Sequence, residues 1–237
     1  MRMFCLFFVL VSAGFFYTTA AQSSGKQVSL TDNSVVKDSA GNVYPAQIWK
    51  NLLATGWYTI KIKKPQDENP EFTLVRLNEK EYKRRMENLA KPRESEYFTT
   101  GKPVSGFTAT DIYGRKYKLK DLKGKVVVMN FWFIACQPCQ QEIPELNDLA
   151  DEYRDSANVV FLAVCLDDKE LIEKFLEKQP FRYTIIDNGR SITSQYGIKS
   201  YPTHLVLNKE GIVVYHSSGY GLGLTTWLRK SIAKALE

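Results

Sequence analysis

The chain has 237 residues, of which 44% are apolar and 24% charged, and its formal net charge is +6. This is an ordinary globular composition, which excludes a disordered chain and a small scaffold built on disulfides. A charge of this size attracts acidic surfaces only weakly, so we expect no nucleic-acid partner. The length suits one large domain, or one domain with a small additional module.

The first 21 residues have the pattern of a secretory signal peptide. Arg2 precedes an uncharged run from Met3 to Ala21, and small residues close the run. A basic start, an apolar stretch and a small-residue end are the three regions of such a peptide. Cleavage after residue 20 or 21 predicts an exported, periplasmic protein and removes Cys5. An uncleaved membrane anchor is the alternative, because the run is just long enough to span a bilayer.

Residues 22–100 predict a small N-terminal module followed by a linker. Residues 22–40 are polar, so we expect a lead-in without regular structure. In residues 41–92 apolar positions recur first at helical spacing and then in alternation, which indicates a small α/β unit. The expected elements are a helix from Pro45 to Gly56, strands over 58–62 and 72–77, and a helix over 79–90 capped by Asn78.

Residues 101–237 predict a larger α/β domain. The apolar run from Lys125 to Phe133 is typical of a central strand buried on both faces. The other expected elements are a hairpin over 107–119, helices over 136–153, 168–179, 192–196 and 224–236, strands over 159–166 and 183–186, and a hairpin over 204–215. The order βαβαβα implies parallel strands with right-handed crossovers, and the closing ββα adds an antiparallel edge. We therefore predict a central mixed β-sheet flanked by helices.

Two cysteines stand where the central strand gives way to a helix, in the sequence Cys136-Gln137-Pro138-Cys139. The N–H groups of a first helical turn are unpaired and the helix dipole is positive there, so a thiolate is stabilised. The three-residue spacing places the second sulfur beside the first. Cys136 is therefore the predicted attacking thiol, and Cys139 the buried thiol that resolves a mixed disulfide on Cys136.

Half of a zinc site and a structural disulfide are the alternatives for this pair. A zinc site needs further Cys or His at suitable spacing, and His204 and His216 stand apart. We predict that both histidines are ordinary strand residues. Cys165 ends an apolar strand pattern, so we expect it to behave as a small core side chain. The prediction is thus redox chemistry with no metal and no cofactor.

Three segments carry a resemblance to a known family: Asn130 to Cys139, Glu142 to Leu146, and Tyr201 to Thr203. With these segments residues 103–237 resemble the thioredoxin superfamily, and most of all its TlpA/ResA-like branch of exported thiol–disulfide oxidoreductases. The resemblance covers a little over half of the chain. It implies a thioredoxin-like fold for the larger domain and a CxxC redox centre.

The resemblance also implies roles for individual residues. Pro202 matches the family's cis-proline beside the redox pair, where the backbone of Tyr201 would pair with an extended substrate. Glu142 matches an acidic residue that would take the proton Cys139 loses, the alternative being a solvent-facing helix residue. Trp132 would pack around the pair or belong to the ordinary core. The predicted substrate contacts are Tyr201, Pro202, Trp132, Gln137 and Pro138.

One departure concerns Asn130, which stands where thioredoxins proper carry a buried aspartate. An amide exchanges no proton at neutral pH, so Glu142 becomes the better candidate base. Pro144 matches the proline that kinks the active-site helix of the family, and we expect it to be structural.

The predicted function is reduction of disulfides in exported proteins, because Pro138 in the second place between the cysteines resembles the reducing members. The implied partners are disulfide-containing exported proteins, among them cytochrome c apoproteins, and a membrane thiol relay as electron donor. A disulfide oxidase or isomerase is the alternative. A thiol peroxidase would carry Thr or Ser three residues before the reactive cysteine, where this chain has Phe133. A non-catalytic docking protein is the third class.

Overall fold

The computed structural model describes residues 29–64 and 70–237. The predicted signal peptide or anchor over residues 1–21 lies outside these residues. Among the described residues, no helix has the length and apolar character needed to cross a membrane.

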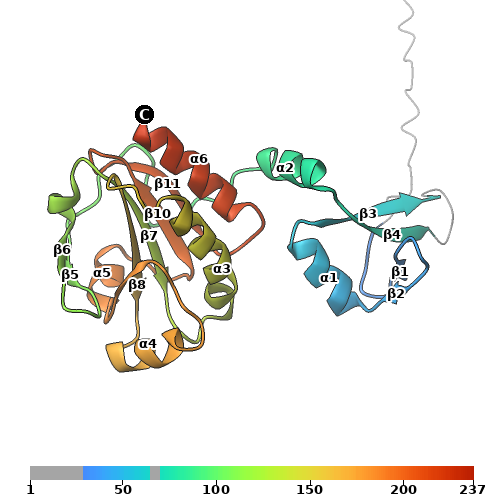
Figure 1. The fold of residues 1–237 in the computed structure, drawn as a ribbon, viewed down its shortest axis with the longest axis horizontal. Helices are drawn as coiled ribbons and strands as arrows, with labels where there is room; N and C mark the ends of the chain where they lie inside the picture. Colours follow the sequence, from blue (N-terminus) through green and yellow to red (C-terminus); the bar gives the residue numbers. More distant parts are fainter. Residues whose placement is uncertain (1–28, 65–69) are drawn as a thin grey trace, which may run out of the picture.

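The larger part of the chain is built on a five-stranded mixed sheet in the order β11-β10-β7-β8-β9 (Figure 1). The central strand β7 pairs in parallel with β8 and antiparallel with β10, and β9 and β11 are the outer strands. The strands are β7 (Val126–Trp132), β8 (Val159–Cys165), β9 (Thr184–Ile186), β10 (Thr203–Leu207) and β11 (Val213–Ser218). The predicted mixed α/β sheet, with a buried central strand, is confirmed.

Alternate side chains of β7 divide the interior into two cores, because successive residues of a strand point to opposite faces. Val126, Val128 and Trp132 face the helices that carry Ile143 and Leu228. The odd-numbered residues of β7 face the other core. The helices and the short turn helix of this part are η1 (Leu119–Leu122), α3 (Gln137–Glu152), α4 (Lys169–Leu176), α5 (Arg190–Gln195) and α6 (Leu224–Leu236). A hairpin of β5 (Thr108–Thr110) and β6 (Lys116–Lys118) precedes β7.

A second sheet of four strands, in the order β2-β1-β4-β3, forms from the N-terminal residues. The elements of this N-terminal part are β1 (Val36–Lys37), β2 (Val43–Tyr44), α1 (Ala46–Ala54), β3 (Tyr58–Lys63), β4 (Glu71–Arg76) and α2 (Glu79–Glu87). The expectation of an irregular lead-in over residues 22–40 is wrong at β1. Val36 is fully buried against Trp49, Phe72 and Leu74, and it pairs in parallel with Phe72 of β4.

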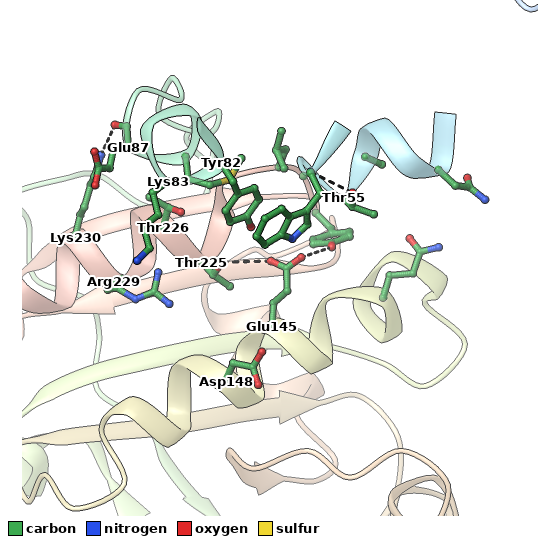
Figure 2. Close-up of a pocket in the computed structure, with 18 residues that line it drawn as sticks. Thr55, Tyr82, Lys83, Glu87, Glu145, Asp148, Thr225, Thr226, Arg229 and Lys230 are labelled. Atoms are coloured by element: carbon green, nitrogen blue, oxygen red, sulfur yellow. Dashed lines mark hydrogen bonds between the residues drawn. The ribbon is translucent and has the colours of Figure 1, made fainter. Parts of the chain in front are cut away.

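The N-terminal sheet is joined to the larger part through α2 and the residues that follow it. Trp227 Nε1 on α6 donates to the Leu89 carbonyl at 3.1 Å, and Lys230 Nζ donates to the Glu87 carbonyl at 2.8 Å. A cleft of about 1100 Å³ lies between the two parts (Figure 2). The stacked rings of Trp57 and Tyr82 line one side of this cleft, with centroids 3.9 Å apart, and Glu145 of α3 lines the other.

Candidate active site

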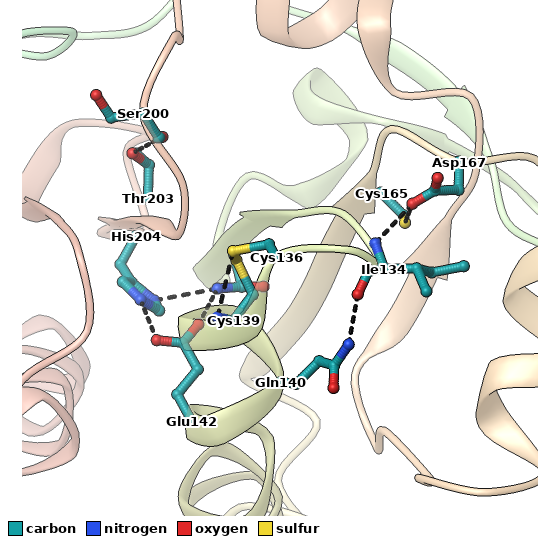
Figure 3. Close-up of a disulfide and its surroundings, with 11 residues drawn as sticks. Ile134, Cys136, Cys139, Gln140, Glu142, Cys165, Asp167, Ser200, Thr203 and His204 are labelled. Carbon is teal, nitrogen blue, oxygen red and sulfur yellow. Dashed lines mark hydrogen bonds and ion pairs between the residues drawn. A yellow bond between two sulfur atoms is a disulfide. The ribbon is translucent and has the colours of Figure 1, made fainter.

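The cysteine pair occupies the junction between β7 and α3. Cys136 is the N-cap residue of α3, and its sulfur accepts a hydrogen bond from the Cys139 N–H at 3.3 Å. The two sulfurs form a disulfide, and the Cα atoms lie 5.3 Å apart (Figure 3). Because Pro138 has no N–H, Gln137 and Cys139 supply the free donors of the first turn. The structure thus holds the predicted pair at the start of a helix in its oxidised form.

Cys136 is more enclosed than the sequence suggests, whereas Cys139 was expected to be buried. Cys136, expected at an exposed helix start, is 5% exposed, and Cys139 is 1% exposed. The residues on either side of Cys136, namely Ala135, Gln137 and Pro138, are exposed. Cys136 is thus flanked by exposed residues in the chain, and Cys139 is the more buried of the two cysteines.

The loop before Cys136 is held in place by Asp167, which follows β8. Its Oδ2 accepts a hydrogen bond from the Ile134 N–H at 2.7 Å and another from the Cys165 thiol at 3.4 Å. Gln140 Nε2 donates to the Ile134 carbonyl at 2.6 Å. Burial raises the pKa of the Cys165 thiol well above its ordinary value, so the group stays protonated. Cys165 is thus a core side chain whose thiol donates to Asp167, the residue that holds the loop.

The predicted substrate contacts fall into two groups. The Tyr201–Pro202 peptide bond is cis, and the Tyr201 ring packs edge-on against Phe133 at 5.4 Å between centroids. Residues on the two sides of this cis bond are also hydrogen-bonded, because Thr203 Oγ1 donates to the Ser200 carbonyl at 2.8 Å. Trp132, in contrast, is 1% exposed and lies in the core beside Phe175 and Phe181. In this state Trp132 offers no surface to a substrate.

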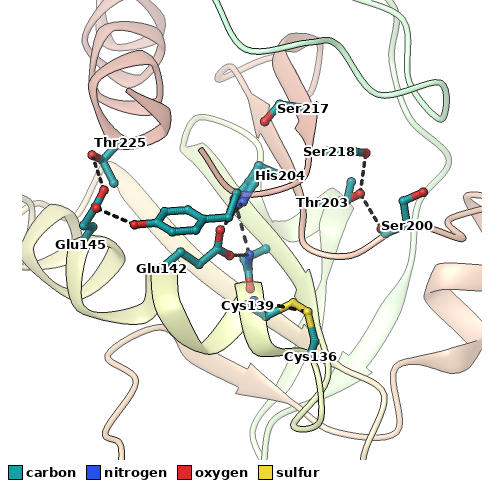
Figure 4. Close-up of polar contacts among 12 residues, drawn as sticks. Cys136, Cys139, Glu142, Glu145, Ser200, Thr203, His204, Ser217, Ser218 and Thr225 are labelled. Atoms are coloured by element: carbon teal, nitrogen blue, oxygen red, sulfur yellow. Dashed lines mark hydrogen bonds and ion pairs between the residues drawn. A yellow bond between two sulfur atoms is a disulfide. The ribbon is translucent and has the colours of Figure 1, made fainter. Parts of the chain in front are cut away.

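Three buried polar side chains meet behind the disulfide. Glu142 Oε1 accepts a hydrogen bond from Asn130 Nδ2 at 2.8 Å, and Glu142 Oε2 lies 3.1 Å from His204 Nε2. Asn130 Nδ2 lies 3.5 Å from His204 Nδ1. Figures 3 and 4 show the carboxylate of Glu142 and the ring of His204 on the Cys139 side of α3. Glu142 is therefore not a solvent-facing helix residue, since its side chain is fully buried in a polar cluster.

The contact between His204 and Glu142 is a feature that the sequence did not predict. His204 lies on strand β10 as expected, but its ring is 1% exposed and bonded to Glu142. The register of the sheet explains this contact, because His204 on β10 stands directly opposite Asn130 on β7. A polar residue two positions after Pro202 in an apolar strand pattern was the available signal.

Two tyrosines complete the surroundings of Glu142. Burial, reinforced by the negative charge of Glu142, raises the pKa of Tyr183 well above its ordinary value. Burial also raises the pKa of Tyr215 to about 12, although its hydroxyl donates to Ser217 at 3.0 Å. Both phenols therefore stay neutral at physiological pH. His216, the other buried histidine, lies apart from this cluster and accepts from the Ser95 N–H through Nδ1 at 3.1 Å.

Comparisons with known proteins agree with this geometry. A model of the AhpC/TSA family matches residues 100–216. Thiol-disulfide oxidoreductase ResA of Bacillus anthracis is 35% identical over 123 residues, covering 51% of this chain and 70% of the relative. The chain belongs to the ResA-like thiol–disulfide oxidoreductases of the thioredoxin superfamily. Thioredoxin-like protein YneN of Bacillus subtilis is 34% identical and covers 48% of this chain and 68% of the relative.

Solved structures of thiol–disulfide exchange proteins share the fold of the larger part of this chain. A thiol:disulfide interchange protein DsbE from Chlorobium tepidum has a TM-score of 0.54 and 27% identity, covering 59% of this chain and 99% of the other. A thioredoxin from Neisseria meningitidis has a TM-score of 0.50 and 26% identity, covering 56% and 88%. The predicted thioredoxin-like fold and thiol–disulfide oxidoreductase activity are therefore confirmed for this ResA-like enzyme.

Proposed function

We propose that this ResA-like protein reduces disulfide bonds in exported polypeptides, with Cys136 as the attacking thiol and Cys139 as the resolving thiol. The observation that carries the proposal is the position of Cys136 at the N-cap of α3, with Cys139 buried one turn behind it. An attacking thiolate needs access and a stabilising helix start, and a resolving thiol needs only proximity.

The reaction balances in two exchange steps. The Cys136 thiolate attacks one sulfur of the substrate disulfide, and the other substrate sulfur leaves as a thiolate. Cys139 then loses its proton and attacks the Cys136 sulfur, which breaks the mixed disulfide and releases the second substrate thiolate. The enzyme ends as the Cys136–Cys139 disulfide, the state that the structure holds. A membrane thiol relay is the proposed donor that returns the enzyme to the dithiol.

The reducing direction follows from the chemistry of the first helical turn. A strong oxidant owes its potential to a well stabilised reduced form. Here Pro138 removes one N–H donor from the turn that faces the Cys136 sulfur, which leaves the thiolate less stabilised. A disulfide oxidase or isomerase is the alternative. Its Cys136 thiolate would need more N–H donors to stabilise it than this helical turn supplies.

The surface around Cys136 supports a polypeptide substrate. The backbone of Tyr201 lies before the cis bond to Pro202, where an extended chain would pair with it. A hollow of about 330 Å³ adjoins the loop before Cys136. Its lining is mainly apolar with three charged side chains: Ile134, Ala135, Leu171 and Phe175 with Asp167, Lys174 and Lys178. Cytochrome c apoproteins, whose haem-site cysteines must be reduced, are one proposed substrate class. We also propose a periplasmic location, with residues 1–21 as signal peptide or anchor. The proposal likewise includes the division of the chain into an N-terminal module with linker over residues 22–100 and a larger domain over residues 101–237.

The direction is tested by comparing two reactions at one pH. The reduced protein is mixed with an oxidised peptide that carries two cysteines, and the oxidised protein is mixed with the same peptide as a dithiol. We expect fast release of peptide thiols in the first mixture and slow disulfide formation in the second, followed by thiol labelling and mass spectrometry. The opposite ratio would reassign the protein as an oxidase. A Cys136→Ser variant, which lacks the attacking thiol, is the blank for both reactions.

A further inference from the structure

The Glu142–His204 pair is unusual because both groups are ionisable, bonded to each other and enclosed by protein. Glu142 is fully buried and His204 is 1% exposed. Burying such groups is costly unless each is hydrogen-bonded, and both are.

The hydrogen bonds assign the proton on the pair. Asn130 Nδ2 is a donor and lies nearest to Glu142 Oε1 and to His204 Nδ1, so His204 Nδ1 is the acceptor of its ring. His204 Nε2 then carries the hydrogen and donates to Glu142 Oε2. In this arrangement Glu142 is a carboxylate that accepts one hydrogen bond on each oxygen.

The same cluster has a second arrangement that holds one more proton. Asn130 Oδ1 is buried and has no hydrogen-bond partner among the described residues. Rotating the Asn130 amide by half a turn directs this oxygen at Glu142 and His204, where it accepts from whichever group has gained the proton. The unpaired Oδ1 is therefore an acceptor that the cluster can use once it takes up one proton.

We propose that His204 is a positioning residue for Glu142: it fixes the carboxylate behind Cys139 and shares the proton that Cys139 releases. The proposal rests on the proposed roles of Cys139 and Glu142 and adds a partner to them. In the resolving step the Cys139 S–H bond breaks, and its proton passes to Glu142 Oε1, which donates it to the rotated Asn130 Oδ1 while Glu142 Oε2 keeps the hydrogen bond from His204 Nε2. The electron pair left on the Cys139 sulfur attacks Cys136, and the substrate sulfur leaves as a thiolate.

The other polar groups around this pair are an amide and phenols that keep their protons. Asn130 on β7 is an amide, and Tyr183 before β9 and Tyr215 on β11 stay protonated because their pKa values are raised. Burial also raises the pKa of Tyr220, after β11, and its hydroxyl donates to Glu145 at 2.8 Å. On α3 itself the group that faces Glu142 is Cys139, three residues before it.

The test separates the two exchange steps. Reduced protein is mixed rapidly with glutathione disulfide, quenched in acid at set times and weighed, which gives the rates at which the Cys136 mixed disulfide forms and disappears. In His204→Gln the glutamine amide can replace the Nε2–H donor to Glu142, but unlike imidazole it cannot take up a proton. We expect formation within about twofold of wild type and resolution slowed by roughly 10²-fold at pH 7, the lower end for loss of general-base assistance.

The pH profile carries the readout that a purely structural role would leave unchanged. Resolution in the variant should rise about tenfold per pH unit between pH 6 and 8, because hydroxide replaces the lost base, whereas wild type should change much less. Glu142→Gln should show the same profile, and the double variant should be no slower than either single one, since the two residues act as one unit.

His216→Gln is the matched control, because His216 is equally buried on the neighbouring strand and contacts Ser95 instead of Glu142. It should resolve the mixed disulfide at the wild-type rate. Wild-type resolution and a wild-type pH profile in His204→Gln would overturn the proposal, and so would equal slowing in His216→Gln. A wild-type protein that forms no mixed disulfide at Cys136 would contradict the proposed function itself.

Discussion

Replacing Cys139 with alanine should stop turnover and leave the substrate joined to Cys136. The Cys136 sulfur still attacks, but the thiol that breaks the mixed disulfide is gone, so the adduct persists. We expect turnover to fall by roughly three orders of magnitude or more, the scale of losing a group that acts directly on the reacting bond. Mass spectrometry of the protein after mixing with an oxidised peptide should show a single adduct that dithiothreitol removes.

Cys165→Ala is the control for this experiment. Cys165 is also buried, but it bonds to Asp167 and its raised pKa keeps it a thiol. Its loss should leave turnover close to wild type and form no adduct. Cys136→Ser should neither turn over nor form an adduct. An adduct mapped to Cys165, or none on Cys136 in the Cys139→Ala variant, would contradict the assigned roles.

Replacing Trp132 with alanine should lower the free energy of unfolding by about 3–5 kcal/mol, the range for truncating a buried large aromatic side chain. Trp132 is 1% exposed, and its ring lies 5.4 Å from that of Phe175 and 5.6 Å from that of Phe181, measured between centroids. Its Nε1 has no hydrogen-bond partner among the described residues, so the loss comes from packing alone. Urea denaturation of the oxidised protein measures the change.

Tyr113→Ala is the matched surface control, because Tyr113 is 84% exposed in the hairpin before β7. Its removal should change the free energy of unfolding by less than about 0.5 kcal/mol, as for other surface positions. A loss below about 1 kcal/mol for Trp132→Ala would show that Trp132 does not belong to the core. That result would favour the prediction that Trp132 contacts the substrate.

The sequence predicts those parts of the fold and the site that depend on local patterns. The apolar run of β7 and the amphipathic spacing of α3 and α6 are visible in the residues themselves, and so is the placement of Cys136 at a helix start. Glu142 was singled out by the resemblance to the ResA-like branch, which places an acidic residue near the pair.

Features that depend on pairing between distant segments could not be predicted. His204 meets Glu142 only because β10 lies antiparallel to β7 with His204 opposite Asn130, and no local pattern encodes that register. Strand β1 has two residues, and Val36 is recognised as part of a core only once β4 lies beside it. The bonds from Trp227 and Lys230 to the end of α2 likewise join residues far apart in the chain.

The reduction potential of the Cys136–Cys139 pair tests the account most directly. The full-length protein is equilibrated with glutathione or dithiothreitol buffers of known potential, and the oxidised fraction is read by thiol labelling. We predict a potential near −270 mV, below the range of the glutaredoxins, as expected for a reductant. A potential near −120 mV would contradict the reductase account and assign the protein to disulfide formation. Failure of the pair to equilibrate at all would contradict its role as a redox centre.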